Sequence, residues 1–186
     1  MRLRQLSVLL TELQAISPLP SDEELGALPE EGSRRLDTYV ELLEAIRQET
    51  QAEFPPEVVS VLLASFGVGD GYGVYWTTVY LIESIADEHI LYTFIQQATT
   101  SPNPGTRKWC CLLLGRRRSL DDLPFLLERL KDEMPAVRTA ALLYGIALLA
   151  QVYPLPQAIP VVAELLDDDQ ASVREHAREV MATLRG

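Results

Sequence analysis

The residues that could take part in chemistry are few and widely separated along the chain. The two histidines are His89 and His176, and the two cysteines are the neighbours Cys110 and Cys111. No spacing typical of a zinc site links these histidines to the cysteines. Adjacent cysteines on one helix cannot form a relaxed disulfide because their side chains diverge, so we expect buried thiols. We therefore predict no metal, no cofactor and no catalytic residue.

A run of four glycines at alternate positions in residues 67–73 is the second candidate for chemistry. Glycine-rich loops can hold phosphate groups with their backbone N–H groups. This run lacks both the preceding strand and the following Gly-Lys-Ser/Thr of such loops, so we interpret it as a turn between helices. The loop contains Asp70 and Tyr72, and Tyr75 and Trp76 follow it. Charge combined with large amphipathic rings also favours contact with a partner.

The elements that must position these side chains are helices, according to their hydrophobic spacing. No segment alternates as a strand does, so we predict an all-α fold. Residues 1–54 are expected to form an N-terminal helical cap, with helices at about 3–17 and 33–52. Polar residues interrupt the apolar start of the chain at helical spacing. This pattern favours an amphipathic first helix over the alternative, a secretory signal peptide.

From residue 55 onward the predicted helices come in pairs, and two of these pairs repeat at a fixed offset. The stretch from Leu123, which leads to Val137-Arg138, recurs 36 residues later as the stretch from Ile159, which leads to Val173-Arg174. Tandem helix pairs of this kind stack into solenoids, which commonly serve as binding surfaces. The four expected pairs are 56–66 with 74–86, 87–99 with 106–117, 121–131 with 136–150 and 156–166 with 171–184.

The two clearest repeats resemble a known family. Pro-Ala-Val-Arg138 after one acidic turn, and Ala-Ser-Val-Arg174 after the next, are similar to HEAT repeats, in particular to the short bacterial, lyase-type HEAT-like repeats. The resemblance covers residues 121–186 closely and 55–120 weakly. It implies one domain over 1–186, an α-solenoid of antiparallel helix pairs with about four degenerate repeats at 55–186.

The resemblance also implies a structural ladder, in which an aspartate in a turn and the arginine that follows it make hydrogen bonds between neighbouring repeats. The positions that match are Asp132, Arg138, Asp168 and Arg174. In the two earlier repeats the arginine position falls on Lys108 and on Tyr75, so the ladder is expected only in the later repeats.

In HEAT-like stacks the second helix of each pair lines the concave side. Trp76, Tyr80 and Glu83 share one helix face at spacings of four and seven, and Trp109 and Arg116 share the corresponding face of a later helix. Two readings stay open for Trp76 and Trp109, as core anchors or as interface residues. The predicted partner-binding residues are Asp70, Tyr72, Tyr75, Trp76, Tyr80, Glu83, Trp109, Arg116, Glu175 and Glu179.

The charge of the chain restricts its partners. Its net charge is −11 at pH 7, which disfavours nucleic acid and favours fast encounter with basic proteins. No uninterrupted apolar segment approaches the ~20 residues of a membrane span. We expect a cytoplasmic protein, monomeric when free, that binds a protein and neither nucleic acid nor membrane.

These features favour a non-enzymatic protein-binding module. The leading hypothesis is a bacterial immunity protein that neutralises a cognate, basic toxin through its concave face. The alternative is a scaffold or regulatory subunit of a larger assembly. Some HEAT-like proteins are DNA glycosylases or chromophore lyases, but a glycosylase needs a basic groove and a lyase an isolated reactive cysteine. We therefore do not expect an enzyme.

Overall fold

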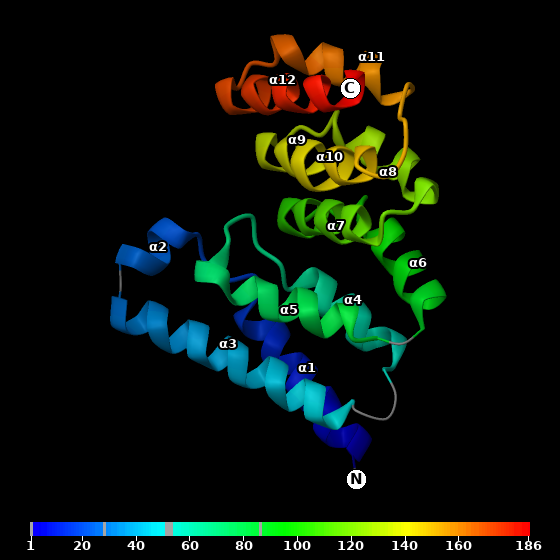
Figure 1. Cartoon of the computed structure of the whole chain (residues 1–186). Helices are drawn as coiled ribbons and strands as arrows, with labels where there is room; N and C mark the ends of the chain where they lie inside the picture. Colours follow the sequence, from blue (N-terminus) through cyan, green and yellow to red (C-terminus); the bar gives the residue numbers. More distant parts are fainter. Residues whose placement is uncertain (1, 28, 51–53, 86) are drawn as a thin grey trace. The chain divides into compact units, whose positions relative to one another are not determined.

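The computed structural model describes residues 2–27, 29–50, 54–85 and 87–186, with side chains from residue 5 onward. All the regular secondary structure of these residues is helical, which confirms the predicted all-α fold (Figure 1). The chain divides into two compact units, residues 1–94 and 95–186, and each is described by itself. The expected division into a cap at 1–54 and repeats at 55–186 stays a prediction.

The first unit is built around its longest helix, α3. Helices α1, α2 and α5 all pack on α3, and α4 packs on α1 and α5. Helix α6 (Glu88–Ala98) begins in this unit and ends in the next. The elements are α1 (Arg2–Ile16), α2 (Asp22–Ala27), α3 (Pro29–Glu49), α4 (Pro56–Ala64), the short 3-10 helix η1 (Gly71–Gly73) and α5 (Val74–Glu83).

Helix α3 begins earlier than the sequence suggested. We expected this helix to begin at about residue 33, whereas it starts at Pro29. Proline is well tolerated in a first helical turn, and Glu30 and Glu31 place negative charge at the positive end of the helix dipole. These local effects outweigh the helix-breaking tendency of Gly32, which is buried.

Tyr39 of α3 holds the core of the first unit together. Its side chain is fully buried, and its hydroxyl lies 2.8 Å from both Ser65 Oγ and Thr78 Oγ1. Its ring packs edge to face on the ring of Tyr75, with 5.7 Å between centroids. Burial raises the pKa of Tyr39 far above its ordinary value, so the phenol stays protonated. This satisfied polar centre connects α3, α4 and α5.

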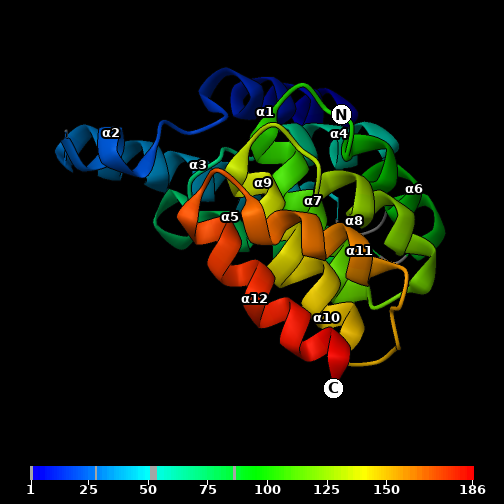
Figure 2. The same cartoon turned by 90° about the horizontal axis from the view of Figure 1, so that it is seen from above.

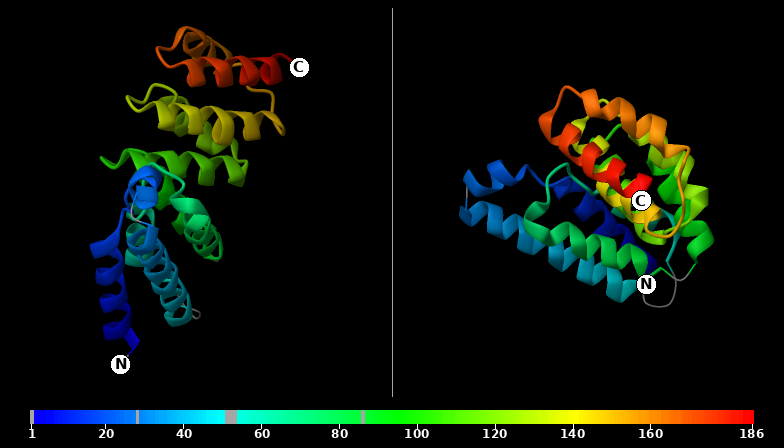
Figure 3. Two further views of the ribbon diagram at one scale, coloured as in Figure 1. Left: turned by 90° about the vertical axis from the view of Figure 1, so that its left-hand side faces the viewer. Right: turned by 45° about the horizontal axis from the view of Figure 1, so that its top comes forward.

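The second unit stacks helices in layers. Figures 1 and 3 show α7, then the continuous run α9–η3–α10, then α12 as successive layers, and Figure 2 shows α11 beside α12. The elements are α7 (Pro104–Arg117), the 3-10 turn η2 (Leu120–Asp122), α8 (Leu123–Arg129), α9 (Pro135–Ala140), the π-helical segment η3 (Ala141–Ile146), α10 (Ala147–Ala150), α11 (Ala158–Glu164), the 3-10 turn η4 (Leu165–Asp167) and α12 (Ala171–Arg185).

Glycines set the spacing between layers of the second unit. A Cβ atom on Gly115 of α7 would overlap the carbonyl oxygen of Tyr144 in η3. A Cβ atom on Gly145 would lie 2.7 Å from Leu126 Cδ2 of α8. Glycine therefore allows the backbones of α7 and η3 to approach more closely than any other residue would permit.

No helix in the described part of the chain has the length and apolarity needed to cross a bilayer.

Candidate functional site

The turns between the helices of the second unit are joined by arginines. Arg107 of α7 donates from Nε to Asp132 Oδ2 and from Nη2 to Asp132 Oδ1, each over 2.8 Å. Both side chains are buried. Asp132 Oδ1 also accepts from the backbone N–H of Met134 at 3.0 Å. This bidentate pair links α7 to the turn that precedes α9.

A second arginine makes the same connection one repeat later. Arg138 donates from Nη2 to Asp168 Oδ1 at 2.7 Å and to Asp169 Oδ1 at 2.9 Å. The hydrogen bond that Arg138 donates to Asp168 raises the pKa of Arg138. Burial by itself raises the pKa of Asp168, but the hydrogen bonds from Arg138 and from the N–H of Gln170 outweigh it, and the pKa lies below its ordinary value.

Each of these arginines is also anchored by its own turn. Nη1 of Arg107 donates to the carbonyls of Ser101 and Pro102, at 2.9 and 3.2 Å. Nη1 of Arg138 donates in the same way to the carbonyls of residues 132 and 133, at 2.8 and 3.1 Å. Nη1 of Arg174 donates to those of residues 168 and 169, at 2.6 and 3.1 Å. In each of the three cases, the two carbonyls that orient the arginine belong to the residues six and five positions before it in the sequence.

The assignment of the first ladder position to Lys108 was wrong, because Arg107 occupies it. The error came from aligning the helices on their pairs of small residues: Cys110-Cys111 and Ala140-Ala141 are 30 residues apart, which pairs Arg138 with residue 108. Arg107 lies three residues before Cys110, whereas Arg138 lies two residues before Ala140, so the register of the small-residue pairs does not extend back to the arginine. The spacing of six residues from the turn would have found Arg107.

The exposed face of α5 carries an aromatic pair. The rings of Trp76 and Tyr80 lie 6.1 Å apart between centroids. Tyr80 is 59% exposed and Trp76 is half-buried. Glu83, also half-buried, follows on the same face, as the spacing predicted. Of the two tryptophans that the sequence left open as core or interface residues, Trp76 lies at the surface and Trp109 does not.

Two predicted contact residues lie in the interior, and for these the prediction was wrong. Tyr75 is 1% exposed, because its ring packs against Tyr39 and Phe66 and its hydroxyl accepts from the Leu19 N–H at 3.1 Å. Trp109 is 3% exposed, since α7 is buried on nearly every side from Thr106 to Gly115. Neither ring can contact a partner while the fold is intact.

The glycine loop is held by a segment far away in the sequence. The Asp22 carboxylate accepts from the N–H groups of Asp70 and Gly71, at 3.0 and 2.8 Å. Tyr72, with φ of 50°, donates from its hydroxyl to the Asp22 carbonyl at 3.0 Å. Gly71 and Gly73 also have positive φ, which glycine adopts without strain. Two N–H groups that would face a phosphate are therefore already bonded to the protein's own carboxylate.

The remaining predicted residues lie at the surface of their own units. Arg116, at the end of α7, is exposed, and so are Glu175 and Glu179 on α12. Glu179 Oε2 lies 3.2 Å from His176 Nδ1. Asp70 in the first unit is exposed as well, although its N–H is bonded to Asp22. The sequence missed Asp22, whose role depends on a contact across 48 residues.

Cys110 and Cys111 are buried, and burial raises the pKa of both thiols, that of Cys111 to about 12.

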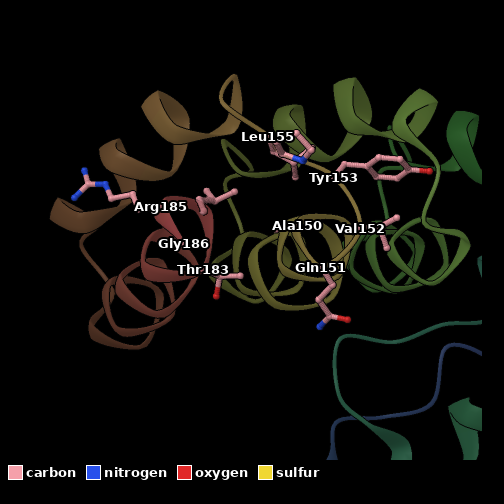
Figure 4. A pocket seen from close by; sticks show the side chains of 10 residues that line it. Ala150, Gln151, Val152, Tyr153, Leu155, Thr183, Arg185 and Gly186 are labelled. Atoms are coloured by element: carbon pink, nitrogen blue, oxygen red, sulfur yellow. The ribbon is translucent and has the colours of Figure 1, made fainter.

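An open hollow of about 350 Å³ lies between residues 150–155 and the end of α12, with Arg185 on one side and Tyr153 on the other (Figure 4). No carboxylate side chain lines it. Across the described ranges, no group of three or more His, Cys, Asp or Glu is arranged to hold a metal.

Comparison with protein families agrees with this ladder of stacked turns. A family model for HEAT repeats matches residues 91–182. The chain is a HEAT-repeat protein over these residues. The match covers the helices that carry Arg107, Arg138 and Arg174, and it begins in α6. No curated protein matches the sequence. HEAT repeats are typical of protein-interaction and scaffold modules, which is the general class to which this chain is assigned.

Proposed function

We propose that the protein binds one protein partner through the exposed face of α5, with the Trp76–Tyr80 pair as the main contact. The observation that carries the proposal is this pair, two large rings in contact on an exposed helix face. Tryptophan and tyrosine are the residue types most enriched at the energetic centres of interfaces. Their rigid rings bury much area at little cost in conformational entropy.

The charge of the chain favours a basic partner. Glu83 lies beside the aromatic pair, and Glu175 and Glu179 are exposed on α12. With a net charge of −11, the molecule attracts a cationic protein over long range and so accelerates association. These features support a specific form of the proposal: an immunity protein that captures a basic toxin, such as a nuclease, in the cytoplasm.

The test is to mix the purified protein with the product of the neighbouring gene, and to measure complex formation by isothermal titration calorimetry at low and high salt. We expect a complex whose association weakens with salt, and protection of cells that express the neighbouring gene product. A complex without protection would favour the scaffold or regulatory subunit. Neither a complex nor protection would reject the immunity role.

A further inference from the structure

The ladder of the second unit has one arginine whose carboxylate partner is missing. Arg107 and Arg138 each bond to an aspartate of the following turn. Arg174 makes the two bonds to its own turn carbonyls but, among the residues that the structure describes, pairs with no carboxylate. Its guanidinium is thus anchored through Nη1 as in the other two arginines. Its Nε and Nη2 atoms donate no hydrogen bond to any residue that the structure describes.

The surroundings of Arg174 differ from those of Arg107 and Arg138, the two arginines that pair with an aspartate. Four residues after Arg107 and Arg138 stand Cys111 and Leu142, which are completely buried. Four residues after Arg174 stands Arg178, which is exposed. The surface beside Arg174 therefore carries a charged side chain at the position where the helices of Arg107 and Arg138 carry buried ones.

The face next to Arg174 is basic within an acidic chain. Arg174, Arg178 and Arg185 are spaced by four and eleven residues along α12, so they lie on one side of the helix. The side chains of Arg178 and Arg185 make no ion pair with any described residue. Glu175 and Glu179 occupy the adjacent side, and His176 and Thr183 lie beyond them. We call the arginine side, residues 174, 178 and 185, the arginine face of α12.

We propose that the arginine face of α12 binds an acidic turn of a partner protein, with Arg174 holding an aspartate carboxylate as Arg107 holds Asp132. The preferred ligand is a turn whose aspartate also caps the backbone N–H two residues later, as Asp132 does for Met134 and Asp168 for Gln170. Because the guanidinium is already fixed by two carbonyls, little side-chain entropy is lost on binding. This surface belongs to the second unit and the Trp76–Tyr80 pair to the first, and the proposal does not depend on the proposed function.

The test uses two synthetic peptides and the whole protein. One peptide has the sequence of residues 163–172, which contains Asp168 and Asp169, and the other has asparagine at both positions. NMR titration follows the Nε–Hε signal of Arg174. We expect the acidic peptide to shift this signal in a saturable way and the asparagine peptide to leave it unchanged.

Two variants distinguish a specific bidentate interaction of Arg174 with a carboxylate from general electrostatic attraction to the arginine face. Arg174→Lys keeps the charge but loses the planar fork, and we expect it to weaken binding by about fivefold, the factor for one exposed bidentate pair. Arg185→Gln removes a charge from the same face and should weaken binding less. Equal weakening by the two variants, an equal response to both peptides, or no shift with the acidic peptide would each overturn the proposal. Circular dichroism of each variant checks that the helices are intact.

Discussion

Arg107 and Asp132 face each other through two parallel hydrogen bonds of 2.8 Å, one from Nε and one from Nη2. The Asp132 side chain is 3% exposed, so the pair is removed from water. Burial alone raises the pKa of Asp132, but the hydrogen bonds from Arg107 and the Met134 N–H outweigh it and hold the pKa below its ordinary value. The pair connects two repeats through a contact that hydrophobic spacing does not encode.

We expect Arg107→Ala to lower the free energy of unfolding by about 3–5 kcal/mol, because it leaves a buried carboxylate without its partner. Urea denaturation followed by circular dichroism measures the change. Arg35→Ala is the matched control, since Arg35 pairs with Glu31 on the exposed surface of α3 and should matter little. A small effect of Arg107→Ala would show that the ladder does not stabilise the fold.

Asp122 should affect stability with the opposite pH dependence to Asp132. Burial raises its pKa, Gln96 and Arg117 only partly offset this, and its Oδ2 atom has no hydrogen-bond partner among the residues that the structure describes. The ionised form is therefore disfavoured in the folded state. The stability of the wild type should fall as pH rises from about 4 through the raised pKa. Asp132, whose pKa is lowered, contributes stability above pH 4 that is lost in stronger acid.

Asp122→Asn tests this difference. We expect the variant to gain stability relative to the wild type as pH rises above about 4, because asparagine cannot ionise. Unfolding free energies at a series of pH values from 4 to 8 would show it. Asp121→Asn removes an exposed neighbouring charge that contributes to the raised pKa of Asp122, so it should reduce the pH dependence only in part. A pH-independent effect of Asp122→Asn would contradict the assignment.

Gly115→Ala should be strongly destabilising, by about 1–3 kcal/mol or more, because the new methyl group would overlap the backbone carbonyl of Tyr144. Gly145→Ala is the comparison variant, for which we expect a smaller loss of stability. Its methyl group would meet the end of the Leu126 side chain, which can move aside, so the loss should be smaller. Thermal unfolding of both variants measures the difference, and the reverse order would mean that η3 shifts away from α7.

The thiols of Cys110 and Cys111 should react slowly in the folded protein. Both are buried, and burial raises their pKa values, so little thiolate exists at pH 8. Alkylation by iodoacetamide, followed by mass spectrometry, should modify both cysteines in urea and neither within the same time in buffer. Rapid modification of either one in buffer would indicate a reactive site.

Replacing Trp76 and Tyr80 by alanine should abolish binding of the protein partner while helical circular dichroism is retained. A loss of roughly 2 kcal/mol per hot-spot residue corresponds to about 30-fold in affinity for each. The control is the double change Val8→Ala and Ile90→Ala, which removes exposed apolar side chains elsewhere in the first unit. Unchanged affinity of the Trp76 and Tyr80 variant would remove α5 from the interface, whereas unfolding would place both rings in the core.

The helical architecture and the last two repeats could be predicted because they depend on local signals. Hydrophobic spacing, prolines in first turns such as Pro135, and the Asp–Arg spacing of six residues are all encoded within one repeat. The exposed position of Tyr80 follows from the same periodicity. The sequence by itself therefore determined the helical architecture and the repeat length, and its resemblance to HEAT repeats implied the ladder partners Arg138 and Asp168.

Only the tertiary structure decided which amphipathic rings are buried. Tyr75 and Trp76 are neighbours in the sequence, yet one packs against Tyr39 and the other lies at the surface. Asp22 accepts hydrogen bonds from the glycine loop only because folding brings the two segments together. The pairing of Arg107 depends in the same way on a segment that it meets only after folding. Burial and pairing are properties of the elements packed around a residue, and periodicity within one helix carries no information about those elements.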